Sequence, residues 1–145
     1  MKDVLGLVKR WAREVGMEVI DVADPRTHFH LMVKEPRLPS VDIVHLRMDD
    51  TYLLLTSSIS VNEEHQEKLL KFDKKSQDEF LWKIRMKLVS MNIEFRWEGG
   101  DGPPTMWRIF SRLYLDKASV QDFWQAYLNV KNASLFLAWS YQSSF

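Results

Sequence analysis

Apolar and polar residues repeat along this chain with two different periods, which predict helices at both ends and strands between them. Residues 2–15 place apolar side chains at helical spacing with charged side chains opposite, and Gly16 then supplies a stop. A second helical pattern begins at residues 119–122 and continues toward the end of the chain. We therefore expect an N-terminal and a C-terminal helix.

The region between residues 17 and 58 contains four short runs with the composition and alternation of strands. The links between these runs are short, whereas parallel strands need crossovers of about a dozen residues or more. The pattern therefore predicts an antiparallel meander. Its four strands are expected at residues 17–22, 28–34, 41–48 and 51–58.

Residues 62–91 form the middle helical region. A capping-box pattern at residues 76–79 predicts the start of a longer helix or of a new segment. Apolar residues of this region fall on a main stripe and on a second stripe, so we expect a helix that packs on two sides, against the sheet and another helix. The second stripe consists of Trp82, Met86 and Val89.

The last two strands are expected as a hairpin. Residues 92–98 alternate between apolar and polar side chains, residues 99–104 hold the glycines and prolines of a turn, and residues 105–114 form the partner strand. The order α-β-β-β-β-α-β-β-α defines an α+β fold, an antiparallel sheet with helices packed on one side. No repeat or linker divides the sequence, so residues 1–145 are expected to form a single domain.

The amino-acid composition excludes several classes of function. Lys plus Arg and Asp plus Glu number 20 each, and a net charge of zero gives no general attraction to nucleic acid or to a membrane surface. The absence of cysteine excludes disulfides, thiol catalysis and cysteine-ligated metals. Lys9, Arg10 and Arg13 interrupt any signal-peptide core, and no apolar run is long enough to span a membrane. We therefore expect a cytoplasmic protein.

Three histidines form a candidate metal site. His28 and His30 lie two residues apart on one predicted strand face, and His45 on the next strand could approach them. Imidazoles in an H-x-H pattern can ligate zinc or copper. The competing interpretation is a set of ordinary histidines on the more polar side of a sheet. A metal-binding protein or an enzyme that uses this cluster is therefore one alternative function.

No other pattern predicts catalysis or a cofactor. The glycine-rich segment 99–104 leads into a strand, whereas phosphate loops lead into a helix N-terminus. None of the serines lies in a nucleophile-elbow motif, and no Ser-His-Asp set stands out. We therefore favour a protein without catalytic activity and without a bound cofactor.

The predicted hairpin interleaves aromatic and basic side chains, which could stack bases and contact phosphates. Strand alternation places Phe95 and Trp97 on the face opposite Arg96, as in an ordinary half-buried sheet. A nucleic-acid-binding module is therefore a second alternative. Its residues would be Phe95, Arg96, Trp97, Trp107, Arg108, Phe110 and Arg112.

The last helix has too few charges for a surface helix. From Phe123 to Phe145 the only charged side chain is Lys131, and residues 135–139 are apolar nearly all the way round. Either the helix ends near Asn132, or Lys131 meets a buried acid, or that side reaches a partner or water. A core helix and a helix at a subunit interface both fit. The candidate interface residues are Trp124, Tyr127, Leu128, Lys131, Leu135, Phe136 and Trp139.

The order of elements resembles the type III secretion chaperone-like fold, in which a helix, a three-stranded meander, a helix, a hairpin and a closing helix follow one another. It is also similar to uncharacterised archaeal proteins thought to share that plan. The match covers nearly the whole chain and adds one strand before the middle helix. The resemblance implies a homodimer that binds other proteins without catalysis, although secretion chaperones tend to be acidic and this chain is neutral. Our leading hypothesis is a self-associating, adaptor-like or chaperone-like binding domain.

Overall fold

A computed structural model describes residues 3–35 and 39–145, and it confirms the α+β fold. The N-terminal helix is confirmed from residue 4, and the predicted start at residue 2 lies outside the described residues. Gly16, with a φ of 74°, supplies the predicted stop, since this left-handed conformation favours glycine. The elements are α1 (Val4–Glu14), β1 (Val19–Asp21), β2 (Thr27–Val33), β3 (Asp42–Leu46), β4 (Tyr52–Ser60), α2 (Glu63–Leu70), α3 (Lys74–Ser90), β5 (Glu94–Glu98), β6 (Met106–Tyr114) and α4 (Val120–Ser144).

The middle helical region consists of two helices, so of the two predicted alternatives the structure shows the start of a new segment. The carboxylate of Asp73 accepts the backbone N–H of Ser76 and thereby caps α3 three residues before the predicted capping box. The observed order therefore contains one more helix than the predicted order. The break places α2 beneath the end of α4, where the ring of Phe72 packs on that of Phe145.

All six strands form one antiparallel sheet with the order β1-β2-β3-β4-β6-β5. The meander from β1 to β4 and the β5–β6 hairpin are both as predicted. The two parts join because β6 pairs with β4 along its whole length, from Tyr52 opposite Tyr114 to Ser60 opposite Met106. The outermost strands are therefore β1 and β5.

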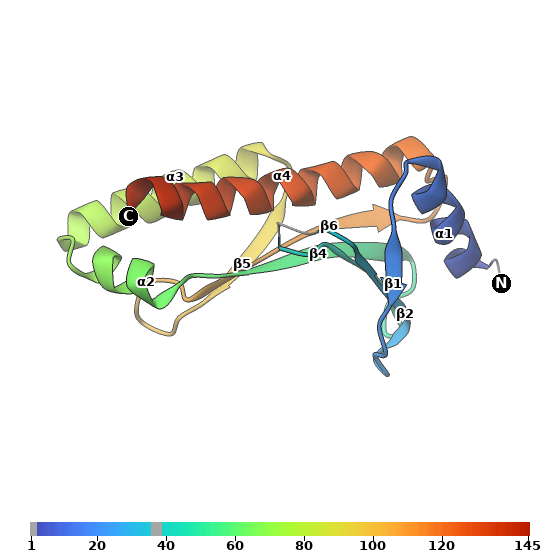
Figure 1. The fold of residues 1–145 in the computed structure, drawn as a ribbon, viewed down its shortest axis with the longest axis horizontal. Helices are drawn as coiled ribbons and strands as arrows, with labels where there is room; N and C mark the ends of the chain where they lie inside the picture. Colours follow the sequence, from blue (N-terminus) through green and yellow to red (C-terminus); the bar gives the residue numbers. More distant parts are fainter. Residues whose placement is uncertain (1–2, 36–38) are drawn as a thin grey trace.

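The helices lie on one face of this sheet. Figure 1 shows α4 running the length of the sheet above β4 and β6, with α1 at one end and α3 alongside. Among the described residues, no helix covers the opposite face. We refer to these two faces as the covered face and the open face.

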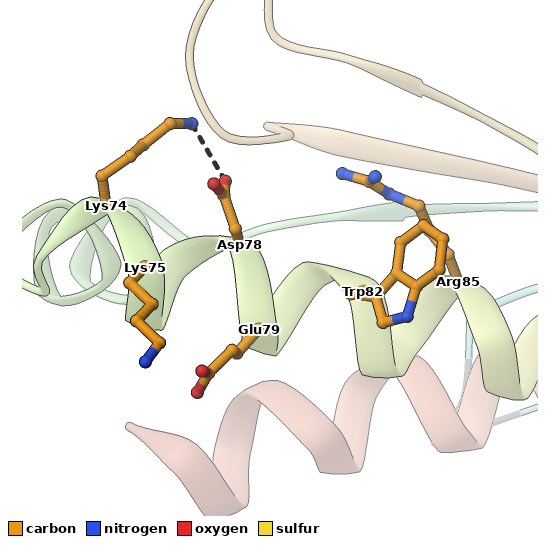
Figure 2. A pocket seen from close by; sticks show the side chains of 6 residues that line it. All are labelled: Lys74, Lys75, Asp78, Glu79, Trp82 and Arg85. Atoms are coloured by element: carbon orange, nitrogen blue, oxygen red, sulfur yellow. Dashed lines mark hydrogen bonds and ion pairs between the residues drawn. The ribbon is translucent and has the colours of Figure 1, made fainter.

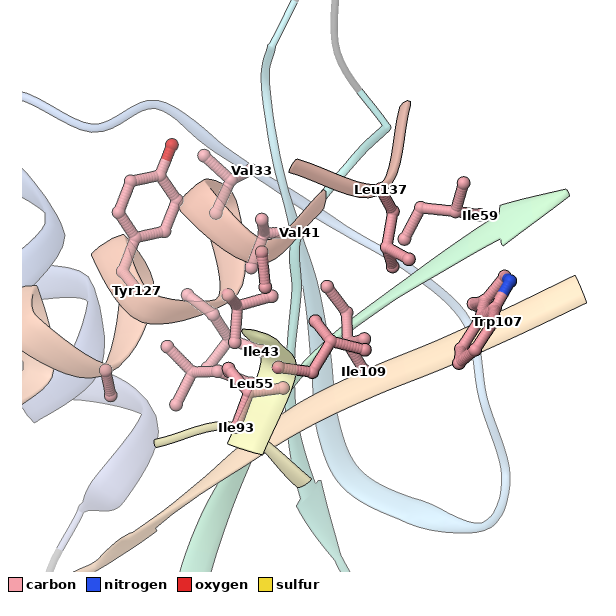
Figure 3. Packing of buried hydrophobic residues seen from close by; sticks show 14 of the residues in the cluster. Val33, Val41, Ile43, Leu55, Ile59, Ile93, Trp107, Ile109, Tyr127 and Leu137 are labelled. Carbon is pink, nitrogen blue, oxygen red and sulfur yellow. The ribbon is translucent and has the colours of Figure 1, made fainter. Parts of the chain in front are cut away.

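The core lies between the covered face and α4. Figure 3 shows side chains of β2, β3, β4 and β6 meeting Tyr127 and Leu137 of α4. The indole N–H of Trp107 donates to the hydroxyl of Tyr141 at 2.9 Å, which satisfies both polar groups in the core. The largest fully buried side chains include Leu31, Ile43, Leu53, Leu55, Trp107, Ile109, Phe123 and Leu137.

Candidate protein-binding surfaces

The three candidate histidines do not point to a common centre. The register between β2 and β3 shifts between Thr27 and Phe29, so the strand bulges at His28. The bulge brings the His28 ring to 5.0 Å from the ring of His45. His30 pairs with Val44 and therefore lies on the face opposite His45, because neighbouring strand residues alternate. The sequence alone could not reveal this bulge.

Both ring nitrogens of His30 already have partners within the protein. Nδ1 lies 3.2 Å from the carboxylate of Asp24, and Nε2 lies 2.8 Å from that of Asp42. The His30 side chain thus connects the β1–β2 loop, through Asp24, with Asp42 at the start of β3. Hydrogen bonds from Arg26 first, and from His30, lower the pKa of Asp24 to about 2.

His45 is also bonded internally, since its Nε2 lies 2.9 Å from the carbonyl oxygen of Asp50. Across residues 3–35 and 39–145, no three His, Asp or Glu side chains gather in an arrangement that could hold a metal ion. The geometry therefore favours structural roles for His30 and His45.

The hairpin arginines lie on the open face, where acidic partners neutralise two of them. Arg108 pairs with Glu98 at 2.9 Å, and Arg112 pairs with Glu94 at 3.1 Å. The guanidinium groups of Arg96 and Arg112 also lie over the ring of Phe110. These contacts leave less free positive charge on the hairpin than the sequence pattern indicates.

The C-terminal helix runs unbroken from Val120 to Ser144, so Lys131 lies in its middle. The ammonium of Lys131 lies 3.5 Å from the carboxylate of Glu35, which is largely buried. The hydroxyl of Tyr127 donates to the same carboxylate, and burial together with this bond raises the pKa of Tyr127. Of the three possibilities for Lys131, the structure shows the one in which it meets a buried acid.

The outer side of α4 carries an apolar stripe that is exposed at its two ends. Trp124, Leu128, Leu135 and Trp139 follow one another at spacings of four, seven and four residues, which places them on one side of a helix. The exposed fraction is 37% for Trp124 and 61% for Trp139, while the two leucines are half-buried. We call these four residues the α4 stripe.

The other predicted interface residues of α4 differ in position. Tyr127 is buried inside the chain, so it is not available to a partner. Phe136 and Leu128 are half-buried and pack against the core, and Lys131 is held at the flank by Glu35. Trp124 and Trp139 of the α4 stripe are thus the predicted interface residues that are exposed.

Helix α3 packs against the sheet and against α4, as predicted, but its second apolar stripe takes part in neither contact. Trp82, Met86 and Val89 are 54–63% exposed. The sheet takes one side of α3, and α4 takes the next, where the rings of Phe80 and Tyr141 meet edge to face at 5.2 Å. No described element lies against the third side, so this stripe remains in solvent.

A cavity of about 660 Å³ opens beside this stripe. Figure 2 shows Lys74, Asp78 and Arg85 on one side of α3 and Lys75 and Glu79 on the other, with Trp82 between them. Lys74 donates to Asp78 at 2.9 Å. The guanidinium of Arg85 lies 4.7 Å from the ring centroid of Trp97 on β5. We call this region the α3 cleft.

The sequence did not single out the α3 cleft, although one signal was present. A helix with two apolar stripes needs two covering elements. In the predicted order of elements, α4 was the one helix that could cover the second stripe of α3. The sequence therefore indicated that one stripe could remain uncovered, but it did not indicate which of the two stripes α4 would cover.

None of the helices in the described part of the chain is long and apolar enough to cross a membrane. The fold and its surfaces define an α+β domain with one covered sheet face and two exposed apolar helix stripes. The chain belongs to the family described as "Uncharacterized conserved protein (DUF2299)", whose match spans residues 5–141. No curated protein matches the sequence.

Two solved structures share the fold. An uncharacterized protein from Methanothermobacter thermautotrophicus is 25% identical, with a TM-score of 0.87 over 97% of each chain. YbjN from E. coli, described as a candidate transcription regulator, is 15% identical, with a TM-score of 0.59 over 92% of this chain and 90% of its own. The expected similarity to uncharacterised archaeal proteins is thereby confirmed. Neither structure is described as a secretion chaperone.

Proposed function

We propose that this protein is a non-catalytic, cytoplasmic protein-binding domain that self-associates through the α4 stripe. The observation that supports this proposal is the apolar row of Trp124, Leu128, Leu135 and Trp139 on the outer side of α4, in which both tryptophans are exposed. Contiguous exposed apolar surface on a globular protein marks interaction sites, and aromatic residues are enriched at the centre of interfaces. A second copy that covers the stripe removes its two tryptophans from water.

The charges around the stripe favour a second copy as the partner. Lys131 is the only charged side chain after Asp122 on α4, and Glu35 neutralises it within the same chain. Two α4 helices can therefore approach each other without bringing unpaired like charges together. Two-fold self-pairing uses the same surface on both copies, so one stripe is sufficient for a closed dimer.

The test is the mass in solution, measured by size-exclusion chromatography with light scattering over a wide range of concentrations. We expect the wild-type protein to be a dimer and Trp139→Glu to be a monomer, because the substitution buries an unpaired charge in the apolar interface. The matched control is Trp82→Glu, which changes an equally exposed tryptophan on α3 and should leave the dimer intact.

A wild-type protein that stays monomeric at all concentrations would contradict the proposal. A dimer that survives Trp139→Glu but not Trp82→Glu would move the interface from α4 to α3. Circular dichroism of each variant checks that the fold is retained, and both substitutions lie on exposed positions that a charge can occupy without entering the core.

A further inference from the structure

The outer edge of the sheet at β5 is available for pairing. β5 is the last strand in the sheet order and pairs with β6 on one side only. No strand of the described chain lies along its other edge. The unpaired N–H and C=O groups of an edge strand are a template for another strand, and partner proteins use such edges by adding an extended segment. The opposite edge strand, β1, is only three residues long.

Trp97 lies on the helix side of this strand, since it pairs with Trp107 of the covered face. Trp97 of β5 is 43% exposed, and Trp82 of α3 is 60% exposed. The guanidinium of Arg85 lies over the ring of Trp97 at 4.7 Å and so connects strand and helix. Arg85 therefore connects Trp97 of the edge strand with the α3 cleft, whose lining includes Arg85 and Trp82 (Figure 2).

Arg85 has an unfilled capacity to donate hydrogen bonds. Its Nε is buried and has no hydrogen-bond partner within the described residues, and Arg85 takes part in none of the ion pairs found there. Buried donors in folded proteins are nearly always paired, and an unpaired one costs free energy. The neighbouring Lys74 is already neutralised by Asp78. Arg85 thus carries a charge with no acidic partner among the described residues, and a carboxylate matches the geometry of its guanidinium.

We propose that the β5 edge and the α3 cleft bind an extended segment of a partner protein that carries an acidic side chain. The segment adds to β5 as a further strand through backbone hydrogen bonds. On its helix side, a carboxylate accepts hydrogen bonds from Arg85, and an apolar side chain two residues away packs against Trp82 and Trp97, since strand residues i and i+2 share a face. The inference rests on the proposed protein-binding role but uses a surface separate from the α4 stripe.

The test begins with a phage-displayed library of random decapeptides selected against the full-length protein. We expect the enriched peptides to share an Asp or Glu with an apolar residue two positions away. A synthetic peptide from the selection, labelled with fluorescein, is then titrated with the protein and followed by fluorescence polarisation. Replacing its acid by the corresponding amide should weaken binding by about tenfold or more, as expected for loss of a charge-assisted hydrogen bond.

Variants of the protein locate the binding surface. Arg85→Ala and Trp97→Ala should each weaken peptide binding by about tenfold, and Arg85→Lys should weaken it less, because it keeps the charge but loses the planar fork. The matched control is Arg112→Ala, which removes an arginine stacked on aromatic rings of the open face and should leave affinity unchanged. Thermal unfolding of each variant shows whether it is folded before its affinity is compared.

Two results would overturn the inference. One is a selection without enrichment of acidic residues, and the other is Arg85→Ala binding the peptide within about twofold of wild type. The measurement also separates this inference from the proposed dimer. If Trp139→Glu abolishes the dimer and keeps peptide affinity, the two surfaces are independent; if the wild-type protein is a monomer that still binds the peptide through Arg85, only the dimer proposal fails.

Discussion

The two faces of the sheet bury aromatic side chains in different ways, and strand β6 shows both. Trp107 points to the covered face and is 0% exposed, whereas Phe110 points to the open face and is 9% exposed. Helix α4 covers Trp107, and its Tyr141 accepts a hydrogen bond from the indole. Phe110 is covered by the guanidinium groups of Arg96 and Arg112, at 5.5 and 6.0 Å from its ring centroid.

A low exposed fraction alone therefore does not identify a core residue. A helix backbone holds its side chains in fixed positions, so a deletion beneath α4 leaves a cavity. Arginine side chains are flexible, and they cover apolar rings with their stems while the charged ends stay in water. We therefore expect Trp107 to contribute much more to stability than Phe110, although their exposed fractions differ little.

The largest effect is expected for Trp107→Ala. The substitution removes a fully buried ring and leaves the Tyr141 hydroxyl without its donor, so the free energy of unfolding should fall by about 4–5 kcal/mol. Urea denaturation followed by circular dichroism measures the change. A loss below about 2 kcal/mol would mean that the covered face collapses around the deletion as readily as the open face.

A buried tyrosine on the covered face should also lower the free energy of unfolding at alkaline pH. Burial raises the pKa of Tyr141 from an ordinary value of 10.0 to about 12. Between these values the unfolded chain has lost the tyrosine proton and the folded chain has kept it, so stability falls as the pH rises. The loss is about 1.4 kcal/mol per pH unit, or about 2–3 kcal/mol by pH 12.

The comparison that isolates this effect uses Tyr141→Phe. At pH 7 the variant should be less stable than wild type by about 1 kcal/mol, because the indole of Trp107 loses its acceptor. As the pH rises from 10 toward 12, the variant lacks this ionisation and the difference should shrink and then reverse. Urea denaturation at a series of pH values tests this, and a difference that stays constant with pH would contradict the assignment.

A smaller effect is expected for Phe110→Ala on the open face. Because Arg96 and Arg112 can move into the space left by the ring, we expect the free energy of unfolding to fall by about 1–2 kcal/mol. The same urea denaturation measures it. A loss equal to that of Trp107→Ala would show that the arginine cover is as rigid as helix α4.

The smallest effect is expected for Arg112→Gln. The ion pair of Arg112 with Glu94 is partly exposed on both sides, and such pairs contribute at most about 1 kcal/mol. The substitution keeps most of the side-chain length, so the ring of Phe110 remains covered. Denaturation in low and high salt measures the electrostatic part, which should vanish at high salt if the exposed pair is its only source.

Local patterns predicted most of the fold because the interactions that form a helix or a hairpin join residues close in sequence. The N-terminal helix, the four-strand meander and the β5–β6 hairpin all appear close to their predicted positions. The break between α2 and α3 was displaced, since Asp73 supplies an N-cap that competes with the capping box predicted at residues 76–79. Differences of this kind arise where two local signals compete.

The candidate sites depend on contacts between residues that are distant in sequence, so the sequence predicted them less completely than it predicted the fold. The sequence indicated that Lys131 needed an acid, but Glu35 lies 96 positions earlier and no local pattern connects the two. The three histidines formed a candidate cluster, and one bulge at His28 together with strand alternation separates His30 from His45. The prediction of an exposed apolar side on α4 placed Trp124 and Trp139 where they are found in solvent.

Local sequence patterns specify the elements of this protein, the antiparallel pairing that short links require, and the nearly uncharged surface of α4. Which apolar stripe each helix buries depends on the packing of the whole chain, because a stripe is buried only where another element lies against it. Helix α4 occupies the covered face, so the stripe of Trp82, Met86 and Val89 and the edge of β5 remain open. Whether an apolar side chain is buried depends on how the helices and the sheet pack together. Hydrophobic periodicity specifies only which side of each element can be buried.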